Sequence, residues 1–327
     1  MTGYILRRAL VTLPTLLGIT LVAFAILNLL PTDPLLTWSD GTAPLSAEAA
    51  SRLRDALQPD SGPVTRYATW LFGLLRFDLG RSLRDGRPVT AVLAEALPWT
   101  LVLNLSALAA IYAVGLPLGW IGARRRGGAA AAGRALLLIL SVVPPFAAAL
   151  LLQRLLAVRL GLLPLQGTGA GDAPGVAAGV DLLRHLVLPT TCLALAGWAY
   201  AARYARAAFR AILAPEALAA ARARGLHGIS LARHFAPNSA LPFVWMVAGI
   251  VPALVSGSVV IEAIFSWPGL GQVLLRGVEG RDYPLVMALM LLSAVTVLAG
   301  QLVADLVLPA IDPRLRDLVA RDENVRG

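Results

Sequence analysis

Hydrophobic runs long enough to cross a membrane recur along this chain and are separated by more polar stretches. A helix needs about 20 apolar residues to span a bilayer core. Six segments come close to that length, at approximately 9–30, 99–123, 135–152, 186–202, 239–261 and 284–304. We therefore expect an all-α polytopic membrane protein with six transmembrane helices.

The remaining segments divide the chain around these spans. We expect an N-terminal transmembrane helix in 1–30, an extracytoplasmic segment in 31–98, a transmembrane core in 99–308 and a cytoplasmic tail in 309–327. The first run is too long for a signal peptide and ends in LLPTDP, without a small-residue cleavage site. Within 31–98, the stretch YATWLFGLLRFDLGRSL indicates a helix lying on the bundle or the membrane interface, or else a surface loop that covers the bundle.

The placement of arginine predicts the topology. The chain is 57% hydrophobic and 14% charged, and all 28 of its basic residues are arginine. With the N-terminus inside, the cytoplasmic segments hold 16 arginines and 6 acidic residues, whereas the other side holds 12 arginines and 13 acidic residues. This positive-inside bias predicts that both termini are cytoplasmic. It also accounts for the net charge of +9, so we expect no nucleic-acid partner.

Several chemistries are excluded by what the sequence lacks. Without lysine there is no phosphate-binding loop of the GxxxxGK[ST] type, so any ATP must be bound by another chain. The single cysteine, Cys192, lies in an apolar run and is expected to be a buried, inert thiol. The three histidines have no Cys or His partners at metal-ligand spacing, so we expect no metal site.

The polar loop at about 208–238 is the cytoplasmic segment with the clearest local pattern. Pro215 and Glu216 favour a helix start, and Gly225 favours its end. A second short helix is expected over 230–235, before Pro237 interrupts the backbone. The pattern predicts a helix–turn–helix unit with arginine on its surface. A basic loop that serves only as a topology signal is the alternative.

Two turn-like stretches, SWPGLG (266–271) and GRDYP (280–284), separate the last two spans. Their aromatic, proline and glycine residues suit a re-entrant turn, which is tolerated at membrane depth where protein buries it. We hypothesise an outer gate or receptor contact; the alternative is a tight interfacial turn with aromatic anchors. The residues concerned are Trp267, Pro268, Gly269, Asp282 and Tyr283.

Motifs along the whole chain resemble one family. EALAAARARG, followed by RHFAPNSALP, is similar to the EAA loop of binding-protein-dependent ABC permeases. YILRRALVTLPTLLGITLVAFAILNLLPTDP, LLRFDLGRSLRDGRPV, VVIEAIFSWPGLGQVLLRGVEGRDYPLV and LPAIDPRLR resemble, in order, other stretches of the first permease subunit of dipeptide, oligopeptide and nickel importers. The loop residues that match, or lie in the matching stretches, are Glu216, Ala217, Ala221, Gly225, Arg233, His234, Asn238, Leu241 and Pro242.

The resemblance implies a type I ABC importer permease fold in the bacterial inner membrane. Such a chain would form half of the pore, together with a second homologous permease subunit. Two ATPase subunits would carry ATP and Mg²⁺, and an extracytoplasmic solute-binding protein would deliver the substrate. The chain itself would hold no cofactor and catalyse no reaction, and its EAA loop would couple it to the ATPase. The substrate would be a di- or oligopeptide, nickel or a related small solute.

An ion-coupled secondary transporter with no ATPase partner is the alternative class. Such a protein is expected to carry ionisable residues within its spans. Asp305, near the cytoplasmic end of the sixth predicted span, is the residue on which that alternative would depend.

Overall fold

The computed structural model describes residues 2–29, 62–124, 127–169, 176–212, 214–231, 233–234 and 258–311. Within them every element is a helix, and the β-structure consists of one isolated antiparallel bridge between Arg81 and Pro88. The expected all-α class is confirmed for this part of the chain. Most of the fifth predicted span and most of the tail lie outside the described residues, as do residues 30–61.

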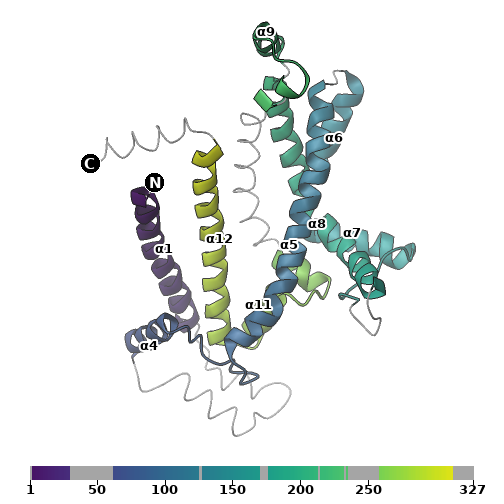
Figure 1. Ribbon diagram of the computed structural model, residues 1–327. Coiled ribbons are helices and arrows are strands. Elements are labelled where there is room, and N and C mark those ends of the chain that lie inside the picture. The colour runs from purple at the N-terminus through teal and green to yellow at the C-terminus, as the bar shows by residue number, and fades with distance from the viewer. Residues whose placement is uncertain are drawn as a thin grey trace. The chain divides into compact units, whose positions relative to one another are not determined.

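The chain forms two compact units, one from residues 1–101 with 268–298, the other from 102–267 with 299–327. Unit 1 contains α1 (Thr2–Leu29), α4 (Pro63–Leu75), the start of α5 (Val89–Arg124), α11 (Leu270–Glu279) and the start of α12 (Tyr283–Ile311) (Figure 1). The beginnings of α5 and α12 pack with α11 around one hydrophobic core, which contains Val89, Leu93, Ala96, Val273, Leu285, Ala288 and Leu289.

Helix α4 is attached to α1 by its tyrosine. The Tyr67 hydroxyl lies 2.9 Å from the Thr20 hydroxyl, and its ring centroid lies 5.2 Å from that of Phe24. No residue of α4 itself is buried, and Val64 and Phe72 are among its exposed apolar residues. The helix expected in YATWLFGLLRFDLGRSL is confirmed as far as Leu75, and its location outside the membrane, at the interface, stays a prediction.

Unit 2 contains the rest of α5, α6 (Gly128–Val142), α7 (Pro145–Leu152), the π-helix η1 (Gln153–Arg159), α8 (Val176–Ile212) and α9 (Pro215–Ala223). Both α6 and α7 contact α8 (Figure 1). The third predicted span, 135–152, is divided between α6 and α7, and Ala131–Val142 is bent by 100° relative to Pro145–Arg159, which comprises α7 and η1. Val143 between them has ψ of 120°, as expected for a residue before proline, which is disfavoured in the helical conformation.

Small residues bring α5 and α8 close together. A Cβ atom added at Gly115 would lie 2.4 Å from the Cβ of Ala201, and one at Gly119 would lie 2.4 Å from the Cβ of Ala205. Gly115 and Gly119 are four residues apart, the spacing of the small-residue motif that allows membrane helices to approach closely. This interface positions α8, and therefore the loop that follows it.

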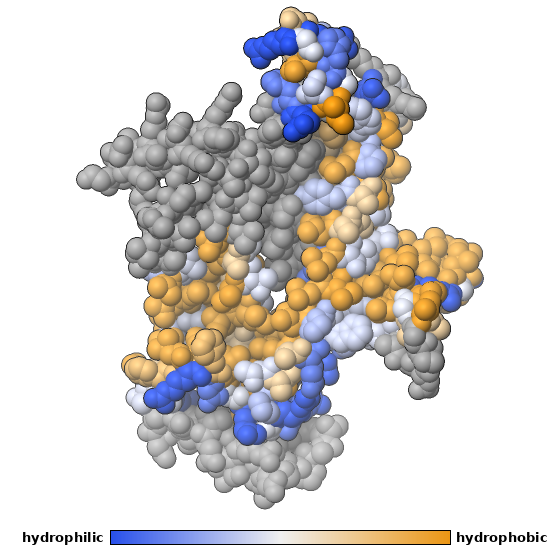
Figure 2. Space-filling view, in the orientation of Figure 1, coloured by the Kyte–Doolittle hydropathy of each residue, from blue (hydrophilic) through white to orange (hydrophobic). Residues whose placement is uncertain are grey.

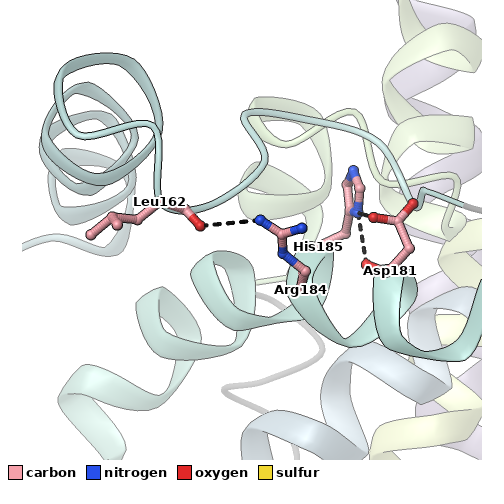
Figure 3. Close-up of polar contacts among 4 residues, drawn as sticks. All are labelled: Leu162, Asp181, Arg184 and His185. Carbon is pink, nitrogen blue, oxygen red and sulfur yellow. Dashed lines mark hydrogen bonds and ion pairs between the residues drawn. The ribbon is translucent and has the colours of Figure 1, made fainter. Parts of the chain in front are cut away.

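Helix α8 begins at Val176, ten residues before the start of the fourth predicted span at 186. The stretch between the third and fourth predicted spans is helical at both ends, where η1 covers its start and α8 its end. Figure 3 shows why polar residues are tolerated in α8. The Arg184 guanidinium donates to the Leu162 carbonyl at 3.5 Å, and His185 Nδ1 lies 2.8 Å from the Asp181 carbonyl oxygen.

Three of the described helices are long and apolar enough to cross a membrane: Val89–Arg124, Val176–Ala211 and Tyr283–Leu302. The bent pair Ala131–Val142 and Pro145–Arg159 adds a fourth if it is one span. Figure 2 shows hydrophobic residues covering much of the visible surface of these helices. A protein that crosses a membrane several times is therefore supported by length and composition.

Candidate functional site

The loop after α8 folds as the sequence predicts. Helix α9 has Pro215 at its start and Glu216 in its first turn. At its end the Leu226 N–H donates to the Ala221 carbonyl at 3.2 Å, and the Gly225 N–H donates to the Arg222 carbonyl at 2.8 Å. These two bonds form a Schellman motif, which requires a left-handed residue after the helix. Gly225 supplies it, with φ of +77°.

A second helical segment begins immediately after this turn. The His227 N–H donates to the Ser230 hydroxyl oxygen at 3.0 Å, and the Ser230 hydroxyl lies 2.7 Å from the His227 carbonyl oxygen. Residues 228–231 and 233–234 are helical. The second helix was expected at 230–235, so the serine lies inside its first turn rather than at its start. The two segments present a compact helix–turn–helix unit.

The exposed surface of this unit is basic. Ala221 is buried and Ala217 half-buried, and α9 contacts α8, whereas Glu216 is exposed. Figure 2 shows α9 and its surroundings as mostly hydrophilic. Ile229 interrupts that surface with 82% of its area exposed. The exposed basic and polar residues around it are Arg222, Arg224, His227, Arg233 and His234. The predicted Asn238, Leu241 and Pro242 lie outside the described residues.

A second cluster of polar residues surrounds Asp282 in unit 1. This side chain is only 1% exposed. One carboxylate oxygen accepts the Ser82 hydroxyl at 2.5 Å, and the other accepts the Leu285 N–H at 3.3 Å. Because Leu285 is the third residue of α12, the second bond caps that helix. Asp282 therefore joins the start of α12 to a segment 200 residues earlier.

The segment around Ser82 is a tight turn. The Ser82 N–H donates to the Arg87 carbonyl, and the Gly86 N–H to the Ser82 carbonyl, both at 2.9 Å. Arg87 also forms an ion pair with Glu95 of α5, and this contact raises the pKa of the Arg87 guanidinium. Both partners are about half exposed, so the pair contributes little stability. Sequence reasoning missed Ser82 and Arg87, for which the only signal was the Asp-Gly pair of the turn.

The residues proposed for an outer gate or receptor contact are divided between the two units. Trp267 belongs to unit 2 and is fully buried, and its backbone N–H donates to the Glu262 carbonyl at 2.8 Å. Pro268, Gly269, Asp282 and Tyr283 belong to unit 1, where buried Gly269 precedes α11 and half-buried Tyr283 begins α12. Glu262 is itself fully buried and was not among the predicted site residues. Its position directly after the fifth predicted span was the available signal.

The long apolar helices among the described residues indicate a multi-pass α-helical membrane protein. A family profile described as "Binding-protein-dependent transport system inner membrane component" matches residues 115–317. The chain belongs to this family of transport permeases.

Two relatives extend the similarity over nearly the whole chain. The oligopeptide transport system permease protein AppB of Bacillus subtilis (strain 168) is 32% identical over 319 residues, covering 96% of this chain and 99% of AppB. The dipeptide transport system permease protein DppB of Escherichia coli (strain K12) is 30% identical over 337 residues, covering 97% of this chain and 99% of DppB.

A solved structure shares the fold. A chain of the MetNI methionine ABC transporter, in inward-facing conformations, matches with a TM-score of 0.51 at 20% sequence identity. The match covers 67% of this chain and 96% of the other. The fold is therefore that of an ABC importer permease of type I.

Proposed function

We propose that this chain is the permease subunit of an ATP-driven importer of di- or oligopeptides. The peptide substrate is supported by the names of AppB and DppB, which align with this chain from end to end. A nickel complex or another small solute is the second possibility within the same family. The alternative of an ion-coupled transporter that depends on Asp305 is not favoured, because the relatives are components of binding-protein-dependent systems.

The proposed assembly places the chain in the bacterial inner membrane with six spans and both termini in the cytoplasm. A second, homologous permease subunit completes the pore, and lipid surrounds both. Two ATPase subunits bind ATP and Mg²⁺ on the cytoplasmic side, and a solute-binding protein delivers the peptide outside. The described apolar helices and the bias of arginine towards the cytoplasmic segments support this arrangement.

The helix–turn–helix unit after α8 is the proposed coupling element. The observation that supports this role is a turn, fixed by the left-handed Gly225, that exposes Ile229 within a basic surface. Protein interfaces combine an apolar anchor with a polar rim, so this surface suits an acidic groove on an ATPase subunit. When ATP closes the ATPase dimer, the two coupling units would move together and shift the pore between two states.

Substitution of Gly225 tests this proposal. A side chain there meets no described atom of this chain within 4 Å, so within the chain the substitution acts through the left-handed backbone. That conformation costs an ordinary residue about 1–2 kcal/mol, and asparagine tolerates it better. We expect Gly225→Val to abolish peptide uptake and stimulation of the ATPase in proteoliposomes that contain the assembled transporter. Gly225→Asn should retain both. Equal activity of the two variants and the parent would contradict the coupling role.

A further inference from the structure

A cleft of about 480 Å³ opens in unit 1, beside the Ser82–Asp282 hydrogen bond. Its walls come from the turn at 82–87, the start of α5, the helix α11 and the start of α12. All the lining residues belong to the same compact unit. The volume lies in the range of small-molecule sites, about 300–1,000 Å³.

Part of the cleft's charge is already engaged in holding its walls together. Asp282 caps α12 and accepts the Ser82 hydroxyl, and Arg87 pairs with Glu95. The turn, α5 and α12 are thereby connected by polar contacts at the edge of the cleft. The buried Ser82–Asp282 bond and the shared hydrophobic core of α5, α11 and α12 hold these walls in place, so the cleft is preformed, which lowers the entropic cost of binding a ligand.

Two guanidinium groups of the lining have no carboxylate partner among the described residues. The Arg84 side chain lies next to Gly280: a Cβ atom added at that glycine would lie 4.0 Å from a terminal nitrogen of Arg84. Within the described part of the chain, Arg84 forms no ion pair. Arg276 hydrogen-bonds to the side chain and carbonyl of Gln272, both at 3.4 Å. The lining holds three arginines and three carboxylates. With Arg87 paired to Glu95 and Asp282 hydrogen-bonded to Ser82, Arg84 and Arg276 exceed Asp85 by one positive charge, which favours an anion, and guanidinium groups fit carboxylates in geometry as well as charge.

The cleft also has an apolar wall and an acid. Trp99, Val92 and Leu285 line it, and Leu285 belongs to the hydrophobic core of unit 1. Asp85 lines it as well, close to Arg84 in the chain. A ligand that satisfies these groups carries a carboxylate, an apolar side chain and, further along, a positive or hydrogen-bond-donating group. The C-terminal end of a short peptide has this composition.

We propose that this cleft binds the C-terminal residue of a peptide on the extracytoplasmic side of the membrane. The carboxylate binds at the rim of the cleft, with Arg84 and Arg276 as its cationic partners, and the terminal side chain packs against Trp99. The inference rests on the proposed function for its peptide chemistry and goes beyond it by giving the permease a substrate site of its own. That site would receive the peptide when the solute-binding protein releases it.

Direct binding to the assembled transporter tests the site. The complex, purified without its solute-binding protein and placed in lipid nanodiscs, is dialysed against radiolabelled Ala-Ala-Phe or against its C-terminal amide. We expect the free acid to bind and the amide to bind about tenfold more weakly or worse, because charge-assisted hydrogen bonds are lost. Arg84→Gln and Arg276→Gln should each weaken binding of the free acid by a factor similar to that of the amide substitution. Arg76→Gln is the matched control, since Arg76 is exposed in the same unit but does not line the cleft.

The outcomes separate this inference from the proposed function. If proteoliposomes with the solute-binding protein take up peptide but the nanodisc complex binds none, or binds acid and amide equally, the cleft site is wrong and the function stands. If ATP drives no peptide uptake in these proteoliposomes, the proposed function is wrong, and the cleft site, which rests on it, is overturned with it. If the two arginine variants weaken only the attachment of the solute-binding protein, the cleft receives a protein carboxylate and the peptide site is overturned. The acid–amide comparison uses the unaltered chain, so it holds even if a variant fails to fold.

Discussion

Asp282 holds two distant parts of unit 1 together through a single carboxylate. One of its oxygens caps α12 and the other accepts the Ser82 hydroxyl, and the side chain is almost completely buried. A buried carboxylate is stable only where hydrogen bonds replace its lost hydration. The hydroxyl and the helix N-terminus provide those bonds, so the residue has a structural role whether or not it also belongs to an outer gate.

Replacing Asp282 with alanine should therefore destabilise the chain. Loss of the cap costs about 0.5–2 kcal/mol. The buried Ser82 hydroxyl still accepts the Asp85 N–H at 3.1 Å but loses the acceptor for its proton, which adds about 1–3 kcal/mol. The apparent melting temperature of the detergent-purified protein measures the effect. In a double-mutant cycle with Ser82→Ala, we expect Ser82→Ala to cost less in the Asp282→Ala background than in the parent, while the cap to Leu285 is lost in either order. Strictly additive losses would contradict a direct bond between the two side chains.

Ile229 makes the coupling surface testable without altering the backbone. We expect Ile229→Asp to weaken binding of the ATPase subunits about tenfold, because a buried apolar anchor contributes more than 1 kcal/mol to an interface. Val64→Asp is a matched control: Val64 is 80% exposed and Ile229 82%, but Val64 lies in the segment predicted to be extracytoplasmic. Titration of purified ATPase subunit into nanodisc-bound permease measures both. Equal affinities for the two variants would remove Ile229 from the interface.

At this scale the sequence predicts local geometry well and distant pairing poorly. Gly225 was expected to end a helix, because the turn depends on its own backbone, and its φ of +77° agrees. Asp282 was identified as a candidate, but its partner Ser82 was not. That hydrogen bond depends on tertiary packing, and neither residue alone specifies it.

The helices extend beyond the apolar runs that predicted them. Helix α8 begins ten residues before the run at 186, and it includes Asp181, Arg184 and His185. Hydropathy marks the part of a helix that lipid can cover, whereas backbone hydrogen bonding continues wherever side chains find partners. Figure 3 shows such partners for Arg184 and His185. The proline pair at 144–145 accounts for a break in the helix at this point, but it does not specify the angle of 100°.

The interface of α5 and α8 allows a test by exchange of one methyl group. Gly115→Ala should destabilise the protein by about 1–3 kcal/mol, because the new Cβ would lie 2.4 Å from that of Ala201. Adding Ala201→Gly removes the opposing methyl group and should restore most of the lost stability. Resistance to proteolysis in detergent compares the parent, the two single variants and the pair. If the pair is less stable than either single variant, the two helices do not meet at these residues.

For the whole molecule, the order of motifs along the chain was more informative than any single one. The predicted family is confirmed by the profile match and by relatives that align from end to end. Fold and family follow from such patterns because they depend on many positions at once. The polar contacts of the cleft in unit 1 involve few positions drawn from separate elements, so no sequence pattern indicates them.

The proposed topology can be tested with single cysteines, because the chain has one cysteine and it is buried. In a Cys192→Ser background, Val64→Cys and Ile229→Cys place thiols at positions of nearly equal exposure, 80% and 82%. A membrane-impermeant maleimide added to spheroplasts should label position 64 at once and position 229 only after permeabilisation. The equal exposure makes any difference in labelling a measure of the side of the membrane. Rapid labelling of position 229 in intact spheroplasts would place the basic loop outside, against the positive-inside bias, and would make contact with a cytoplasmic ATPase impossible.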